Sequence, residues 1–210
     1  MEKSVRTVFS PHESEKIIEK SRFITYSTHT ESEEAARAFV AGIRKEHSLA
    51  THVCFAFIAD KAGNLQRFSD DGEPQGTAGV PMLEVLKAKR LCETAVAVVR
   101  YFGGVKLGAG GLVRAYSSCV AENLDGADIR SLEVCVEITL SVDYTGIDGV
   151  QKYLSSHSCS LLSTDYGEKV QFLVLVKKAD SDTFIDGVID YMQGRVETAR
   201  GNEYYAPFKE

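Results

Sequence analysis

The sequence lacks any long apolar run and has only five cysteines, at wide spacing. No stretch approaches the roughly 18 consecutive apolar residues of a membrane-spanning helix, so we expect a soluble protein with no membrane partner. Residues 1–16 also lack the apolar core of a signal peptide, which predicts a cytoplasmic location. In that reducing compartment an odd number of scattered cysteines argues against a disulfide framework.

Several catalytic motifs are absent as well. There is no C-x-x-C, no H-E-x-x-H and no G-x-S-x-G anywhere in the chain. His52 and Cys54 share one face of a predicted strand, but two ligands do not make a zinc site. Ser117 and Ser118 have no histidine or aspartate at a useful spacing. We therefore expect no metal, no cofactor and no catalytic residue, and the sequence favours a protein that is not an enzyme.

The chain has 210 residues, of which 44% are hydrophobic. This is enough for compact cores in one large domain or two small ones. The net charge of −6 is unevenly distributed: residues 1–130 carry 17 basic and 17 acidic side chains, and residues 131–210 carry 7 and 13. Residues 85–120 contain six basic side chains and one acidic side chain, Glu93. The positive field of this stretch can attract phosphate although the net charge of the whole chain is negative.

Periodicity and turn signals outline the N-terminal half. They predict one or two strands over residues 17–28, a hairpin over residues 52–69 and a buried strand over residues 94–102. A helix is expected after a capping box formed by Thr30 and Glu33. Two more helices are expected over residues 81–91 and over residues 112–124, and a domain boundary is expected at residues 125–128.

The remaining chain has the predicted order β-α-β-β-α-β, which is the ferredoxin-like pattern. We therefore predict an α+β protein of two domains, residues 1–128 and 129–210. In the last helix three aspartates fall on the side opposite the apolar stripe, as a solvated face or as part of a protein-binding surface. They are Asp182, Asp186 and Asp190.

Five glycines among residues 103–111 separate the buried strand from the next helix. Glycine lets a backbone approach another group closely, and a helix N-terminus attracts anions. Lys106 and Arg114 add positive charge. The alternative is a tight crossing in which the glycines only permit packing, and no named phosphate-loop motif matches. Tyr101 and Phe102 beside Arg100 either stack on nucleic-acid bases or are buried at the end of the strand.

Residues 69–81, SDDGEPQGTAGVP, form the second candidate stretch. Asp70, Asp71 and Glu73 supply carboxylates that bind a hard cation or orient a water molecule. The spacing does not match an EF-hand loop. Asp-Gly and Glu-Pro are also ordinary turn dipeptides, so a solvated turn is the alternative interpretation.

Four ordered motifs together resemble the IMPACT family, specifically its bacterial YigZ-type members. They are SRFIT at 21–25, ATHVCFAF at 50–57, SDDGEPQGTAGVP at 69–81 and VVRYFGGVKLGAGGLVRAY at 98–116. The resemblance implies an N-terminal α/β sandwich similar to the ribosomal protein S-five domain-two-like fold. It also implies a small C-terminal ferredoxin-like domain similar to those of translocating elongation factors, and a role in translation.

The family motifs select two sets of residues in this chain. The glycine-rich set, expected to bind phosphate or nucleic acid, comprises Arg100, Gly103, Gly104, Lys106, Gly108, Gly110, Gly111 and Arg114. The acidic set, to which the resemblance assigns no reaction, comprises Ser69, Asp70, Asp71, Gly72, Glu73, Pro74 and Thr77.

Three functions follow as hypotheses. The first is a non-enzymatic, translation-associated regulator that binds RNA or the ribosome through the basic, glycine-rich loop. The second is a phosphate- or nucleotide-binding enzyme that combines this loop with the acidic loop. The third is a regulator that binds a protein partner through residues 131–210.

Overall fold

The computed structural model describes residues 4–207. Residues 1–3 and 208–210, which the two predicted domains include, lie outside that range. The chain divides into two compact units, of which the first is Val5–Ser131 and the second begins at Leu132. We call them the N-terminal unit and the C-terminal unit.

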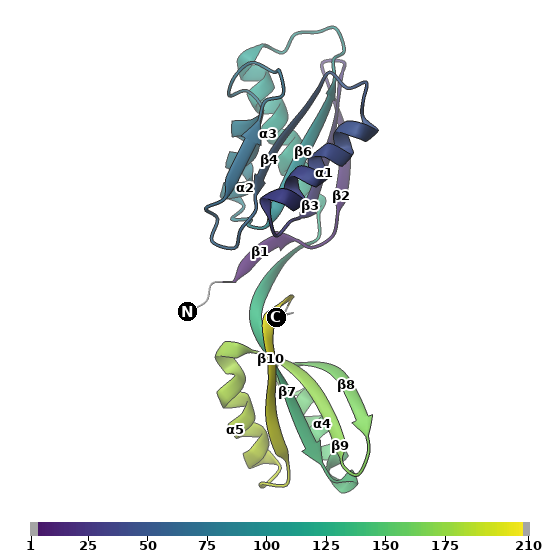
Figure 1. Cartoon of the computed structure of the whole chain (residues 1–210), viewed down its shortest axis with the longest axis vertical. Coiled ribbons are helices and arrows are strands. Elements are labelled where there is room, and N and C mark those ends of the chain that lie inside the picture. The colour runs from purple at the N-terminus through teal and green to yellow at the C-terminus, as the bar shows by residue number, and fades with distance from the viewer. Residues whose placement is uncertain (1–3, 208–210) are drawn as a thin grey trace. The chain divides into compact units, whose positions relative to one another are not determined.

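The N-terminal unit is built on an antiparallel sheet with strand order β2-β3-β6-β4-β5 (Figure 1). A short strand, β1, precedes it, and three helices complete the unit. The strands are β1 (Val5–Val8), β2 (His12–Ile18), β3 (Ser21–His29), β4 (His52–Ile58), β5 (Gln66–Ser69) and β6 (Thr94–Tyr101). The helices are α1 (Glu33–Glu46), α2 (Gly79–Ala88) and α3 (Gly108–Gly126).

Strand β6 lies in the middle of this sheet and is buried on both faces, as its apolar sequence predicts. Val96 and Val98 pack into the cluster that contains residues of α2 and α3. Ala97 and Val99 pack into the cluster that contains Ile43 of α1. Alternate side chains of a strand point to opposite faces, so this strand joins two hydrophobic cores.

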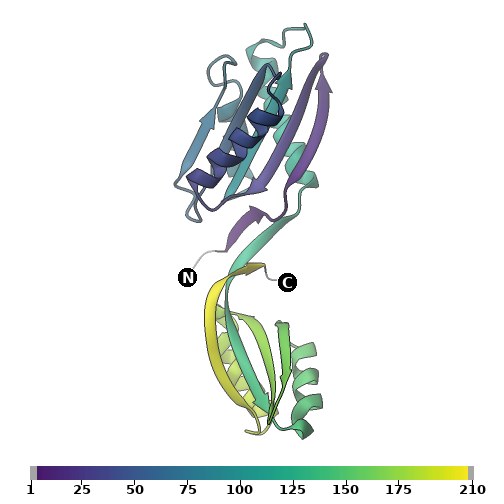
Figure 2. The same ribbon diagram turned by 45° about the vertical axis from the view of Figure 1, so that its right-hand side comes forward.

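Helices therefore cover both faces of the sheet, and Figure 2 shows α1 in front of it. The predicted capping box is wrong in one respect, because the N-cap of α1 is Ser32, whose side chain accepts a hydrogen bond from Ala35 N. Thr30 instead donates to Ser32 O from the loop before the helix.

The first hairpin is longer than predicted, since β2 begins at His12 rather than near Ile17. Its turn consists of Glu19 and Lys20, both with positive φ (45° and 66°). Two such residues form the tight turn whose twist suits an antiparallel pair. Strand β1 was not predicted from the sequence. The backbone just after it is fixed by a hydrogen bond from Phe9 N to Asp128 O (2.7 Å).

The C-terminal unit has the predicted ferredoxin-like arrangement. Its strands lie in the order β10-β7-β9-β8, and all three pairings are antiparallel. Alternate residues of β7 and β9 pack with α4 and α5 into one apolar core. The elements are β7 (Ile129–Val142), α4 (Ile147–Ser155), β8 (Ser160–Tyr166), β9 (Val170–Lys177), α5 (Ser181–Tyr191) and β10 (Glu197–Pro207).

The outward acids of α5 are exposed as expected. Asp182 forms an ion pair with Arg200 of β10. Among the helices of residues 4–207, none combines the length and the apolar character that crossing a lipid bilayer would require.

Candidate phosphate-binding groove

The start of the glycine-rich loop is packed tightly against the β2–β3 turn. A Cβ on Gly103 would lie 1.9 Å from Lys20 O, so only glycine fits at this position. Gly103 N also donates to Ser21 Oγ (3.3 Å). The turn and the loop therefore lie together at one end of the sheet (Figure 1).

Beyond Gly103, the loop borders an open groove of about 620 Å³ between β2 and the first half of α3. One wall comes from β2 and its turn, and the other comes from the loop and α3. The lining residues are Lys16, Ile18, Glu19, Val105, Lys106, Leu107, Gly111, Arg114, Ala115 and Ser118.

Two of the predicted cations line this groove. Lys106 and Arg114 are both exposed, and within residues 4–207 neither has an ion-pair partner. Lys16, a third cation in the wall, pairs with Glu122. Glu19 is the one carboxylate among the lining residues, so the groove carries a positive balance.

Helix α3 begins inside the predicted loop, at Gly108, so Gly108, Gly110 and Gly111 form its first turn. The N-cap position, Leu107, provides no side-chain hydrogen bond. The backbone N–H groups of a first turn lack partners within the helix and carry partial positive charge. A Cβ on Gly110 would lie 3.7 Å from Arg114 Nη1, which places that guanidinium beside this turn.

Arg100 does not belong to this exposed surface, contrary to its expected role as a phosphate ligand. Only 4% of it is exposed. Its Nη1 donates to Glu73 Oε1 (2.6 Å) and its Nη2 donates to Ser21 Oγ (3.2 Å). A buried cation needs an internal counter-charge, and Glu73 supplies it.

Glu73 is the centre of a buried polar cluster. Besides Arg100, its Oε1 accepts a hydrogen bond from Tyr116 OH (2.8 Å). The Cys54 thiol lies 3.4 Å from the same hydroxyl, and His52 Nε2 lies 3.9 Å from Glu73 Oε2. Burial raises the pKa of Cys54 to about 12 and raises the pKa of Tyr116 well above its usual value.

Asp70 holds the start of α2. Its Oδ1 accepts hydrogen bonds from Ala78 N (2.9 Å) and Gly79 N (2.8 Å), and its Oδ2 accepts one from Gly76 N (2.8 Å). Partial burial acts to raise the pKa of Asp70, but these three donors stabilise the charged form more strongly, and the pKa lies below its usual value. Its lone pairs are occupied by the protein's own backbone.

Asp71 ties the acidic loop to β4 and α1. One carboxylate oxygen accepts from Val53 N (2.7 Å) and the other from Arg44 (2.6 Å). Asp71 N donates to Ser69 Oγ (3.2 Å), and His52 Nδ1 lies 2.8 Å from Asp71 O. Gly72, which follows, has a φ of +86° and turns the chain back beside His52.

The end of the acidic loop is a compact turn. Thr77 donates its hydroxyl hydrogen to Pro74 O (2.6 Å), and Thr77 N donates to the same oxygen (3.1 Å). Glu73 and Thr77 of this loop are therefore buried, Asp70 and Asp71 are half-buried and hydrogen-bonded within the protein, and Gly72 and Pro74 are exposed. Within residues 4–207, no group of three or more His, Cys, Asp or Glu side chains is arranged to hold a metal ion.

Sequence reasoning missed two contributors to this region. Lys16 enters the groove from β2, outside the basic stretch of residues 85–120. Tyr116 reaches back from α3 to Glu73. Strand alternation could have revealed Lys16, because it shares a face with Ile18, whereas the contact of Tyr116 with Glu73 depends on the folded chain.

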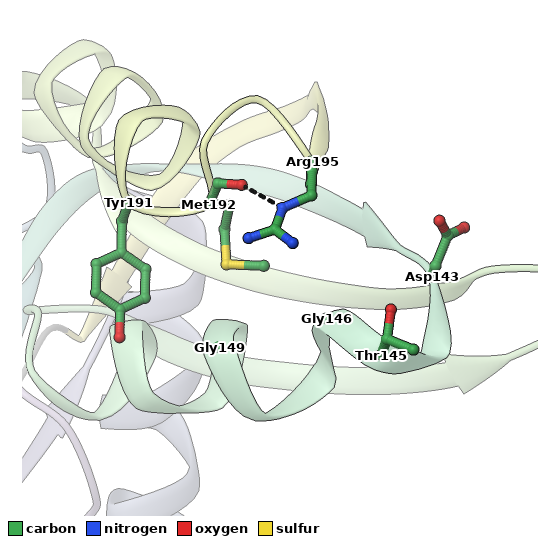
Figure 3. Close-up of a pocket in the computed structure, with 7 residues that line it drawn as sticks. All are labelled: Asp143, Thr145, Gly146, Gly149, Tyr191, Met192 and Arg195. Atoms are coloured by element: carbon green, nitrogen blue, oxygen red, sulfur yellow. Dashed lines mark hydrogen bonds between the residues drawn. The ribbon is translucent and has the colours of Figure 1, made fainter.

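The C-terminal unit has a separate, smaller hollow of about 270 Å³ between the start of α4 and the end of α5 (Figure 3). Arg195 Nε donates to Met192 O (3.3 Å) at its border. The hollow is lined by one acidic and one basic side chain and by two glycines of the α4 region. The lining residues are Asp143, Thr145, Gly146, Gly149, Tyr191, Met192 and Arg195.

Residues 19–124 match the profile described as "Impact N-terminal domain", and residues 140–195 match the one described as "Domain of unknown function (DUF1949)". The chain belongs to the IMPACT family. Its groove, glycine-rich loop and acidic loop all lie within or immediately beside the N-terminal IMPACT match.

Other IMPACT proteins match nearly the full length. The chain is 39% identical to "IMPACT family member YvyE" of Bacillus subtilis (strain 168), over 95% of this chain and 92% of that protein. It is 38% identical to "IMPACT family member YigZ" of Escherichia coli (strain K12), over 86% and 89%. A crystal structure of "an hypothetical protein" aligns with a TM-score of 0.62 at 36% identity, covering 94% of this chain and 97% of the other.

Proposed function

We propose that this IMPACT-family protein is a non-enzymatic component of translation that binds RNA or the ribosome through the groove beside α3. The observation that carries the proposal is the position of Lys106 and Arg114. Both are exposed, line one groove and stand beside the uncapped first turn of a helix. Such a surface suits phosphate oxygens, and phosphate contacts dominate the affinity of most nucleic-acid-binding proteins. This role would place the protein in the cytoplasm.

The arrangement of the acidic loop supports a binding role over catalysis. Asp70 and Asp71 accept hydrogen bonds from backbone N–H groups, and Glu73 neutralises Arg100 inside the protein. A carboxylate whose lone pairs are so engaged is a poor base and a poor metal ligand. The loop therefore acts as a structural support for the end of the sheet that carries the groove.

The experiment is a filter-binding titration against structured RNA at several salt concentrations. Each phosphate contact adds about 0.7–0.9 to the slope of log affinity against log salt. We expect K106E and R114E to weaken binding and to reduce that slope, each by about one contact. K45E is the matched control, because Lys45 is an exposed lysine of α1, outside the groove, with no ion-pair partner within residues 4–207.

Two outcomes contradict the proposal. If the wild-type protein binds neither RNA nor ribosomes at low salt, the proposed function is lost. If K45E weakens binding as much as K106E, the effect comes from net charge, and the groove is not the site. A thermal-shift screen with nucleotides tests the enzymatic alternative, since a ligand at 100 times its dissociation constant adds about 2.7 kcal/mol of stability.

The edge strand β8 favours a second candidate function, the binding of a protein partner by the C-terminal unit. Leu161 and Tyr166 are 52% and 66% exposed on a strand whose outer edge has no neighbour among the described strands. Exposed apolar side chains on an edge strand favour pairing with another chain. We expect a charged substitution, L161D, to abolish such binding in the full-length protein without affecting RNA binding.

A further inference from the structure

Phe102 lies at the surface and contacts the buried Arg100, which in turn contacts the buried Phe23. Phe102 follows β6 directly and is 46% exposed. The guanidinium carbon of Arg100 lies 5.4 Å from the centroid of the Phe102 ring and 5.3 Å from that of the fully buried Phe23. A buried cation thus contacts both an internal and an external aromatic ring, and each contact is of cation–π type.

The backbone under the exposed ring is fixed by hydrogen bonds. Phe102 N donates to Thr51 Oγ1 (3.0 Å), and the next residue, Gly103, donates to Ser21 Oγ (3.3 Å). The same hydroxyl oxygen accepts from Arg100 Nη2 (3.2 Å). An aromatic side chain on a fixed backbone loses little conformational entropy when a ligand binds, which favours a role in binding.

This ring also lies at the end of the sheet that carries the groove. In the β3–β6 register, Tyr101 pairs with Arg22, so Phe102 leaves the sheet beside the β2–β3 turn. Lys106 follows four residues later, and a chain of that length spans at most about 14 Å. The exposed Phe102 thus lies close along the chain to Lys106, which lines the groove with Arg114, and it leaves the sheet beside the exposed Lys20 of the turn.

We propose that Phe102 stacks on an unpaired base of single-stranded RNA while Lys106 and Arg114 contact the phosphates beside it. The inference rests on the proposed function and specifies its substrate class. Proteins that bind single strands combine a basic groove with aromatic platforms, because every base offers a π face. In a duplex the bases are already stacked, so duplex RNA gains nothing from Phe102. The flanking cations favour this partner over an apolar protein surface.

The test measures the affinity of the full-length protein for a short single-stranded oligoribonucleotide and for its blunt duplex, at low salt. We expect the wild type to prefer the single strand. F102L should weaken single-strand binding about tenfold, within the 5- to 150-fold range of base–aromatic stacking, and should leave duplex binding unchanged. F102W should keep the affinity, since it keeps a π face.

The matched control is F68L. Phe68 of β5 is 48% exposed, close to the value of Phe102, but it lies on the edge strand beside Gly79 of α2. F68L should bind both RNAs as the wild type does.

Two results would overturn the stacking role. They are an F102L protein that binds the single strand within twofold of the wild type, and one that loses duplex and single-strand affinity equally. In either case the loss of binding in K106E and R114E still supports the phosphate groove. If the wild type binds neither RNA, the proposed function fails and the stacking role fails with it.

Discussion

Glu73 Oε1 and Arg100 Nη1 lie 2.6 Å apart, and the two side chains are only 3% and 5% exposed. This ion pair joins the acidic motif to the end of the central strand, which carries the second motif. The acidic loop and the glycine-rich stretch therefore form one structural unit: the acidic loop provides the counter-charge, and Arg100 contacts the aromatic ring next to the glycine-rich loop.

Removing the carboxylate should destabilise the N-terminal unit severely. Breaking a buried pair by deleting one partner costs about 3–5 kcal/mol, because the remaining charge is left without compensation. We expect E73A to lower the free energy of unfolding by about this amount in urea denaturation. E84A, which removes a 62% exposed partner of Lys87, is the control and should change it by less than about 0.5 kcal/mol. Equal effects in the two variants would contradict the internal role of Glu73.

Asp70 should contribute to stability through the start of α2. D70A removes an acceptor shared by three backbone N–H groups, and we expect a loss of about 1–2 kcal/mol, typical of a lost helix cap. D186A, an exposed aspartate of α5, serves as the control. A stability for D70A equal to that of D186A would show that the backbone donors are satisfied in another way.

The same residue predicts a pH dependence. Its pKa is lower in the folded protein than in the unfolded chain, so its contribution is fully present above the unfolded pKa, near 4. The contribution is lost as the pH falls through the folded pKa. We therefore expect the difference in unfolding free energy between the wild type and D70A to be constant at neutral pH and to shrink below about pH 4. Denaturation across this pH range measures the difference. If it stays constant down to pH 2, the charged form of Asp70 does not stabilise the folded protein.

Two glycines of the glycine-rich stretch, residues 103–111, should differ sharply in their tolerance of alanine. G103A places a Cβ against Lys20 O, which must displace the β2–β3 turn, and we expect a loss of 3 kcal/mol or more, at the upper end of overpacking costs. Gly110 lies in the first turn of α3, where an added Cβ meets only ordinary contacts. We expect G110A to raise stability by up to about 1 kcal/mol, because alanine loses less entropy in a helix. Thermal denaturation of the two variants tests the contrast.

The Cys54 thiol should be unreactive in the native protein. Burial raises its pKa to about 12, and its sulfur is enclosed beside Tyr116 and Asp70. Because the thiolate is the reactive form, alkylation at pH 8 should label Cys54 only through unfolding, and much more slowly than the half-buried Cys159. Peptide mass spectrometry after timed alkylation measures both rates. Similar rates for the two would show that Cys54 is accessible.

Local signals were sufficient for much of the fold. The apolar run of β6, the amphipathic pattern of α1 and the β-α-β-β-α-β order of the C-terminal unit all appear in the structure. These features depend on periodicity within one element, which the sequence displays directly. The N-cap was misplaced by two residues because Thr30 and Ser32 are both good caps, and only the entry path of the chain selects Ser32.

The candidate site was less predictable, because its residues acquire their roles through contacts between distant segments. The sequence predicts that Arg100 is a surface cation beside a glycine-rich loop. In the structure its side chain is buried and donates a hydrogen bond to Glu73. The sequence leaves two interpretations of Gly103, a phosphate-binding loop or a tight crossing, and the structure shows it packed closely against Lys20. Lys106 lies in the loop and Arg114 lies in the first turns of α3, as expected, and their binding of phosphate stays a prediction.

The central position of β6 has a consequence for biosynthesis. Its neighbours, β3 and β4, both precede it in the chain, so both partners have already left the ribosome when this strand emerges. A segment of such high β-propensity would aggregate readily if left uncovered. The order of synthesis therefore makes a pairing partner available on each side of β6 as soon as this strand emerges, which shortens the time during which it is exposed.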